Sequence, residues 1–193
     1  MQVSKLEAIK SQLTTAIQLL FTGGDPVAVH TLIGAASILS FDLVEKKFPG
    51  GAWEHYVLKT NDITKLTYIK MAREAQNFFK HAVSDPDAVL EFRPEQSEVL
   101  LWAAMQNYLR LLEGGERKLP ELSVYELWFI AKHHMDFDTS SDKVQRLLDG
   151  ADSFFPRLAQ LSLDAQKLEG SRLLKEYQAD LSGRWEELSP ARQ

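Results

Sequence analysis

The sequence predicts an all-α fold, an antiparallel bundle of four long helices with additional C-terminal helices. Apolar side chains recur three and four residues apart through most of the chain, which is the period of a helix with one buried face. Glycine, proline and aspartate residues mark the ends of these segments. No run of useful length alternates between apolar and polar residues as a strand does. With 193 residues, of which 45% are hydrophobic, the chain can bury a substantial core.

The first two helices are predicted over residues 5–22 and 26–47. The capping box SKLE opens the first helix, since its serine and glutamate can satisfy two unpaired amide groups reciprocally. The motif GGDP ends it and begins the second, with Asp25 as the N-cap and Pro26 at the first helical position. Two helices joined so closely are expected to lie antiparallel. Because the second is apolar almost all round, we expect it to be the most buried helix of the bundle.

Two more long helices are predicted, one over residues 62–83 and one from Pro94 to about residue 113. In the first of these, apolar and aromatic side chains fall on one side of the helix, Phe78 and Phe79 among them, so that side is expected to face the core. The turn sequence SDPD follows it. The last long helix is ended by a pair of glycines.

The C-terminal part of the chain continues in helices of a different character. A second capping box, SVYE, opens a helix at Ser123. Beyond residue 138 the pattern changes to one or two amphipathic helices with balanced charge, whose leucines are spaced too irregularly for a coiled coil. We therefore expect a helical-bundle core over residues 1–138 and a C-terminal helical extension over residues 139–193, packed on that core or on a partner.

Composition and charge restrict where the chain acts and what it binds. It has no cysteine, so disulfides and thiolate metal sites are excluded and a cytoplasmic location is favoured. The longest uncharged stretch, residues 26–41, is shorter than the roughly 20 apolar residues that cross a membrane, so we expect no membrane association. The net charge of -5 argues against broad DNA binding.

Familiar signatures of phosphate-binding, hydrolytic and calcium-binding sites are absent from the sequence, and no cofactor is predicted. The residues around the predicted helix end near 133 include metal-ligand types, namely His133, His134, Asp136 and Asp138. Neighbouring histidines on a helix diverge by about 100°, and no second cluster completes a site, so we predict no metal. His30, on the apolar second helix, is interpreted as a hydrogen-bonded core or interface histidine.

One polar face carries the candidate chemistry of the chain. Arg73, Asn77 and His81 are four residues apart along the third predicted helix, with Gln76 and Lys80 beside them. A histidine can take a proton from a ribose 2′-hydroxyl, an arginine can hold the attacked phosphate, and an asparagine can orient either group. These residues therefore suit metal-free RNA cleavage. The simpler interpretation is a solvated face that ends in a histidine near the negative end of a helix dipole.

Two stretches of the chain, AIQLLFTGGDPVAVHTLIGAA and NFFKHAVSDPDAVLEF, resemble a family of uncharacterised bacterial proteins. Members of that family share a GGDPVxVHTL segment and an NFFKHAxxDPD segment, and they are cytoplasmic by implication. The resemblance extends over about residues 5–135 and leaves out the C-terminal extension. Since the family is uncharacterised, this resemblance implies no activity.

More remotely, a helix pair joined by a short Gly-Asp turn, with an alanine-rich second helix, resembles the HEPN (higher eukaryotes and prokaryotes nucleotide-binding) superfamily. That resemblance implies an antiparallel helical bundle, commonly a dimer, and in many members a metal-independent endoribonuclease. The HEPN motif consists of an arginine, a polar residue that is often asparagine, three or more further residues and a histidine. Asn77 and His81 match it, whereas Gln76 stands in place of the arginine.

Two functions are compatible with these residues. The first is an interaction or ligand-binding module without cleavage activity, because Gln76 cannot supply the charge that stabilises a developing phosphorane. It would form a homodimer and bind a nucleotide, RNA or a protein partner through Arg73, Gln76, Asn77, Lys80 and His81. The second is a metal-independent HEPN-type endoribonuclease, a toxin or defence effector, with Arg73, Asn77 and His81 as its catalytic residues.

Overall fold

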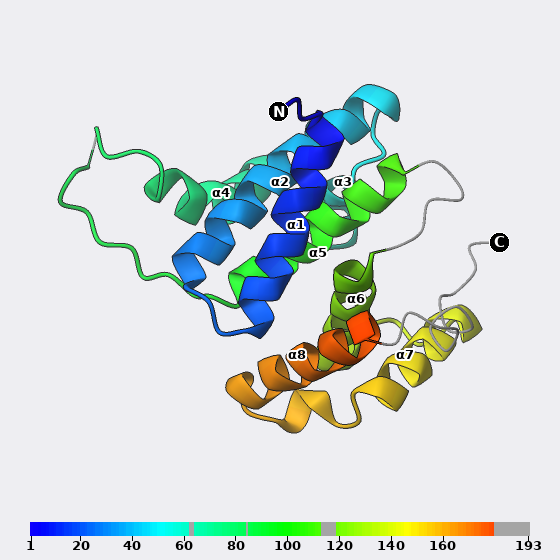
Figure 1. Cartoon of the computed structure of the whole chain (residues 1–193). Coiled ribbons are helices and arrows are strands. Elements are labelled where there is room, and N and C mark those ends of the chain that lie inside the picture. Colours follow the sequence, from blue (N-terminus) through cyan, green and yellow to red (C-terminus); the bar gives the residue numbers. More distant parts are fainter. Residues whose placement is uncertain (62–63, 84, 113–118, 180–193) are drawn as a thin grey trace. The chain divides into compact units, whose positions relative to one another are not determined.

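The structure is a computed structural model that describes residues 1–61, 64–83, 85–112 and 119–179 (Figure 1). Within these residues every regular element is a helix and no strand occurs, so the predicted all-α class is confirmed. The α-helices are α1 (Lys5–Phe21), α2 (Pro26–Lys47), α3 (Trp53–Asn61), α4 (Lys65–Phe78), α5 (Gln96–Leu111), α6 (Pro120–Lys132), α7 (Asp142–Phe154) and α8 (Leu163–Ala179), with short 3-10 turns at His134–Asp136 and Leu158–Gln160.

The chain divides into two compact units. The first comprises Met1–Ala16 and Gly24–Glu116, and the second comprises Ile17–Gly23 and Arg117–Gln193, so α1 contributes residues to both. This division does not coincide with the expected boundary after residue 138, because α6 packs on α7 and α8.

Local hydrogen bonds set the beginnings of the first two helices. Ser4 Oγ accepts a hydrogen bond from the Glu7 backbone N–H at 3.2 Å, and the Glu7 carboxylate accepts one from the Ser4 N–H at 2.8 Å, which is the predicted capping box. Asp25 Oδ1 accepts the N–H of Ala28 at 2.9 Å, and α2 then begins with a proline. Gly23 has a φ of 74°, which a residue without a Cβ adopts readily. The chain reverses there, and α1 and α2 run in opposite directions (Figure 1).

In the first unit, α5 is more completely buried than α2. Twelve of the 16 residues of α5 are buried, whereas only seven of the 22 residues of α2 are. The prediction that the second helix would be the most buried is therefore wrong. Helix α2 packs on α4 and α5, but part of it stays at the surface, where Val27 is 42% exposed. An apolar composition all round a helix does not ensure that neighbours cover every side of it.

Helices α2 and α5 run in the same direction. Near their beginnings, His30 Nδ1 lies 2.9 Å from Ser97 Oγ. Near their ends, the Arg110 guanidinium lies 5.4 Å from the centroid of the Phe48 ring. The long connection that such a pair needs contains α3, α4 and the extended segment that follows α4 (Figure 1). The expected antiparallel arrangement therefore does not describe this pair.

The third predicted helix is shorter than expected. It was predicted over residues 62–83, but the start at residues 62–63 lies outside the described residues, and α4 ends at Phe78. The N–H groups of Lys80 and His81 both donate to the Asn77 carbonyl, at 3.2 and 3.0 Å, and close the last turn. The chain then takes an extended course towards α5 (Figure 1), because the SDPD sequence favours a turn over a further helical turn.

In the second unit, aromatic side chains pack around α6. Phe21 meets Trp128 in an edge-to-face arrangement with 5.5 Å between ring centroids, and Tyr125 stacks on Trp128 at 5.9 Å. Trp128 Nε1 donates to the backbone carbonyl of Gln166 at 2.7 Å, which links α6 to α8. The Phe21 ring also lies so close to Gly170 that any side chain there would collide with it. Gly170 therefore allows α8 to approach the end of α1.

Candidate functional site

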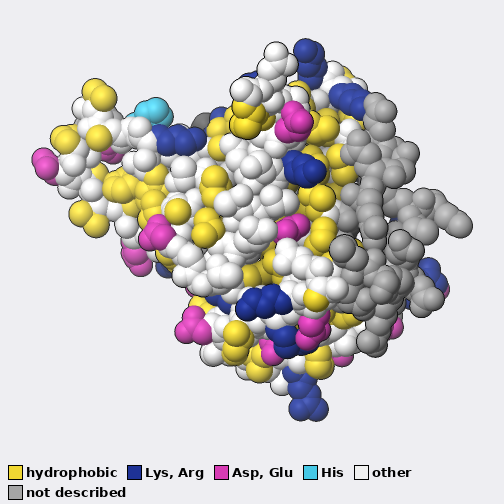
Figure 2. All heavy atoms as spheres, viewed as in Figure 1, with side chains coloured by type: hydrophobic (Ala, Val, Ile, Leu, Met, Phe, Trp, Pro, Cys, Tyr) yellow, Lys and Arg dark blue, Asp and Glu magenta, His cyan; other side chains and the backbone are white. Residues whose placement is uncertain are grey.

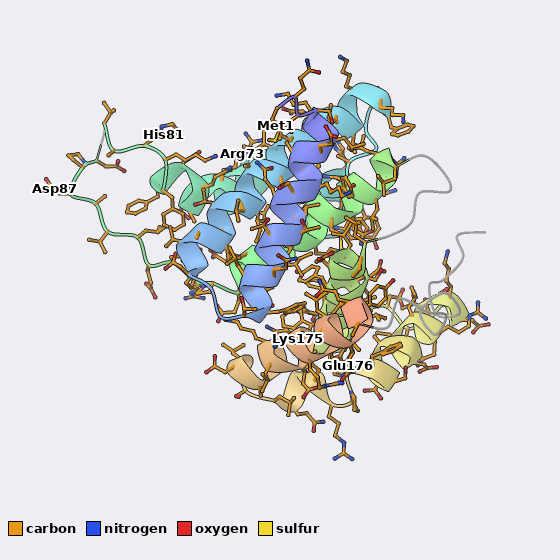
Figure 3. The ribbon with its side chains drawn as sticks, in the orientation of Figure 1. Met1, Arg73, His81, Asp87, Lys175 and Glu176 are labelled. Carbon is orange, nitrogen blue, oxygen red and sulfur yellow. The ribbon has the colours of Figure 1, made fainter. Side chains whose placement is uncertain are left out.

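Four of the five predicted site residues lie at the surface around the end of α4, and we call them the α4 polar face. Arg73 is half-buried, and Asn77, Lys80 and His81 are exposed. Figure 3 shows Arg73 on α4 and His81 where the chain leaves that helix. In the described part of the chain, the side chains of Arg73, Lys80 and His81 form no hydrogen bond or ion pair. Two cations, an amide and an imidazole are therefore available to a partner.

Gln76, the fifth predicted site residue, points into the first unit instead. Its side chain is 2% exposed and packs on Gly34 of α2, where a Cβ would lie 2.7 Å from Gln76 Cδ. The missing side chain of Gly34 makes room for this long amide between α2 and α4. The amide nitrogen is buried and has no hydrogen-bond partner among the described residues. Gln76 therefore does not belong to the α4 polar face.

Two half-buried aromatic side chains contact the buried His30, next to the end of α4. Phe79 and Phe92 meet the imidazole in edge-to-face arrangements, with ring centroids 5.8 and 5.1 Å away. His30 Nδ1 lies 2.9 Å from Ser97 Oγ. Burial lowers the pKa of His30, because a charged imidazole would lose its hydration there. The prediction of a hydrogen-bonded core histidine is confirmed, and Phe79 faces this core as predicted.

The ligand-type residues that follow α6 are held in local contacts. His133 Nδ1 lies 3.2 Å from Asp136 Oδ2, and its ring packs on Phe129 with 4.4 Å between centroids. Asp138 Oδ1 accepts the Ser140 N–H at 2.9 Å, and this hydrogen bond lowers the pKa of Asp138. Across the described ranges, no group of three or more His, Cys, Asp and Glu side chains lies close enough to hold a metal ion.

A second polar cluster, which the sequence did not predict, lies where α2, α3 and α5 meet. The buried Glu54 carboxylate accepts a hydrogen bond from Asn107 Nδ2 at 2.9 Å. Asn107 Oδ1 accepts the backbone N–H of Trp53 at 2.8 Å, so this one amide side chain fixes the start of α3. Burial raises the pKa of Glu54, although the Asn107 hydrogen bond opposes the effect. The WEHY sequence contains no signal that separates this glutamate from a solvated one.

Glu45 closes the turn between α2 and α3 in the same region. Its carboxylate accepts the N–H groups of Gly50 and Ala52, each at 3.1 Å, and Oε1 lies 3.2 Å from His55 Nε2. Burial raises the pKa of Glu45, but these hydrogen bonds outweigh burial and lower the pKa overall. Glu45 and Glu54 therefore both have structural partners.

Among the helices in the described ranges, α2 is the one that is long and apolar enough to cross a membrane, by length and composition alone. A core helix of a folded domain passes the same test. The buried residues of α2 include the polar side chains His30 and Ser40, and the helix packs on α4 and α5. These are contacts of a helix within a folded unit.

Comparisons of the chain with protein-family models, with curated proteins and with solved structures found no match. The resemblance to the HEPN superfamily therefore stays a prediction. The function has to be inferred from the α4 polar face and from the position of Gln76 beside it.

Proposed function

We propose that the chain is a HEPN-like helical interaction module that binds its partner without cleaving it. The α4 polar face is the binding surface. One observation carries the proposal: Gln76, which stands where the HEPN motif has its arginine, lies inward against α2. The α4 polar face retains side chains that can bind a partner, but it has no cation at the position where the HEPN motif has its arginine.

The chemistry of RNA cleavage explains why that cation matters. Negative charge develops on the phosphate as the 2′-oxygen attacks, and a cation or hydrogen-bond donor has to meet it. Loss of one such group typically costs about 3–4 kcal/mol of transition-state stabilisation. Gln76 is neutral and buried, so it cannot replace the missing charge. Arg73 lies one helical turn before Asn77 and outside the motif.

The α4 polar face suits a polar or anionic partner. Arg73 and Lys80 supply positive charge, and Asn77 and His81 supply hydrogen-bonding groups. A nucleotide, an RNA or an acidic protein surface has the complementary chemistry.

The proposal includes a homodimer and a cytoplasmic location. Sedimentation velocity of the purified chain tests whether it forms the homodimer.

A metal-independent HEPN-type endoribonuclease is the second candidate. The Asn77 carbonyl accepts the His81 N–H at 3.0 Å, which keeps the two matching motif residues next to each other at the surface. In this function His81 would take the proton from the 2′-hydroxyl, and Arg73 would contact the phosphate.

Incubation of the purified chain with a labelled RNA in EDTA separates the two functions. We expect the RNA to stay intact, since the motif lacks its cation. Cleavage by the wild type that is lost in His81→Ala would overturn the module in favour of the nuclease. Lys175→Ala, which removes an exposed cation of α8 (labelled in Figure 3), is the control for an unspecific effect of charge. Matching melting curves would show that His81→Ala still folds.

A further inference from the structure

Two aromatic side chains lie at the surface of the first unit. Phe48 is 36% exposed and Tyr56 is 57% exposed, and no other aromatic residue among the described side chains is exposed. Phe48 follows the last residue of α2, and Tyr56 lies in the first turn of α3. Large rings normally bury most of their area, so two exposed rings in one short stretch indicate a contact surface.

Tyr56 is supported by other aromatic residues. Its ring lies 5.0 Å from that of Trp53, and Trp53 meets the buried Trp102 in an edge-to-face arrangement at 6.3 Å. The Trp53 backbone N–H is bound in turn by Asn107. Three rings therefore lead from the core to the surface, with Tyr56 as the outermost. A ring supported in this way loses little conformational entropy when a flat ligand stacks on it.

Two cationic side chains lie near the Phe48 ring. The Lys47 ammonium lies 5.5 Å from its ring centroid, and the Arg110 guanidinium lies 5.4 Å from it. Two more exposed lysines are close in the chain, Lys46 at the end of α2 and Lys59 in the last turn of α3. Figure 2 shows Lys and Arg side chains over the end of α2.

Two of the three acidic residues in the same part of the chain are engaged in the fold. Glu45 binds the backbone of the turn between α2 and α3, and Glu54 is buried against Asn107. The third, Asp42, is exposed and lies one turn before Lys46. Among residues 42–59, the exposed charged side chains are therefore one aspartate and three lysines, a local excess of positive charge in a chain whose net charge is -5.

We propose that this aromatic–cationic surface binds single-stranded nucleic acid; it consists of Lys46, Lys47, Phe48, Tyr56, Lys59 and Arg110. Aromatic side chains stack on unpaired bases of any sequence, and lysine and arginine bind the phosphates that join them. A duplex hides the faces of its bases, and an acidic polypeptide has no bases to stack on the rings. The surface is built on α2, α3 and α5, so the proposal does not rest on the α4 polar face.

Fluorescence anisotropy with the full chain tests this proposal. The probes are labelled single-stranded RNA and DNA of about 12 nucleotides, within the usual site size of single-strand binders. We expect Tyr56→Ala to weaken binding about five- to 150-fold, the effect of losing one stacked base. Lys47→Gln should weaken binding and reduce the slope of log affinity against log salt by about 0.7, because one phosphate contact is lost.

Matched substitutions elsewhere control for unspecific effects. Leu168 and Lys175 are both exposed on α8, so Leu168→Ala and Lys175→Gln should bind the probes as the wild type does. Tyr56→Leu keeps apolar contact with Trp53 but removes the aromatic ring, and it replaces Tyr56→Ala if the alanine variant has an altered melting curve.

The results show whether the aromatic–cationic surface binds single-stranded nucleic acid, and whether it prefers RNA or DNA. Tighter binding of RNA assigns the surface to RNA, and equal binding of both probes assigns it to single strands in general. No saturable binding, equal binding of a duplex, or competition by polyglutamate as strong as by unlabelled oligonucleotide would overturn the proposal. So would binding that Tyr56→Ala leaves unchanged and His81→Ala abolishes, because the ligand would then occupy the α4 polar face.

Discussion

Replacement of Gln76 by arginine tests the observation on which the proposed function depends. The substitution restores the residue of the HEPN motif, but the structure leaves no room for it. Gln76 is 2% exposed, and a Cβ at Gly34 alone would approach its side chain to 2.7 Å. A guanidinium in this position would be a buried charge between α2 and α4, and the Gln76 amide nitrogen already has no hydrogen-bond partner among the described residues.

The expected loss of stability is large. A buried charge without a partner destabilises a protein by about 3–5 kcal/mol. The whole free energy of unfolding of a domain is about 5–15 kcal/mol, so Gln76→Arg should unfold at a much lower urea concentration. Asn77 is the matched control, since it is the next residue and is exposed. Asn77→Arg should change the free energy of unfolding by no more than about 0.5 kcal/mol.

Urea denaturation followed by circular dichroism measures both variants. Equal midpoints for Gln76→Arg, Asn77→Arg and the wild type would show that the Gln76 side chain is not buried against α2. If Gln76→Arg also gained metal-free RNA cleavage, the side chain at position 76 would have to reach the α4 polar face, which would contradict its burial against α2.

Three further changes have defined outcomes. Asp25→Ala should destabilise the chain by about 1 kcal/mol, because it removes the acceptor for the Ala28 N–H in the first turn of α2, and an unchanged thermal midpoint would contradict that cap. Phe79→Ala should destabilise the chain by less than the about 3–5 kcal/mol of a fully buried aromatic ring, because Phe79 is half-buried, whereas His81→Ala should leave the melting curve unchanged; a large loss in His81→Ala would make His81 a structural residue. Burial holds the pKa of His30 below its ordinary value of 6.5, so the unfolded chain takes up a proton that the folded chain does not. The free energy of unfolding should therefore fall as the pH drops below 6.5, and His30→Gln should show a smaller fall; identical pH profiles would exclude His30 as the cause.

Local sequence signals predicted those features that depend on residues close together in the chain. The capping box of Ser4 and Glu7 and the N-cap of Asp25 both join residues three apart, and the structure has both. The helical period likewise predicted that Phe79 faces the core while Asn77 does not. Interactions of this kind act within one or two helical turns, so their pattern is visible in the sequence itself.

At the end of α4, local sequence signals were not sufficient to predict which polar side chains are exposed and which are buried. Periodicity grouped Gln76 with Arg73, Asn77 and His81 as one polar set, but the structure separates Gln76 from the other three. The decisive neighbour is Gly34, a glycine in a different helix, whose missing side chain leaves space for the amide. In the sequence, Gln76 is one polar residue next to others, and nothing there indicates that Gly34 in another helix leaves space for its side chain.

The sequence by itself determined the all-α class, the turn between α1 and α2 and the set of residues with candidate chemistry, because these depend on short-range spacing and side-chain type. Only the tertiary structure decided that α2 and α5 run parallel, that α5 is buried more fully than α2, and that His30 contacts Ser97, which is 67 residues away. It also brought Glu54 to Asn107, 53 residues away, and left Phe48 and Tyr56 exposed. Burial depends on which helices meet, and that choice is made by long-range packing, which leaves no periodic signal in the chain.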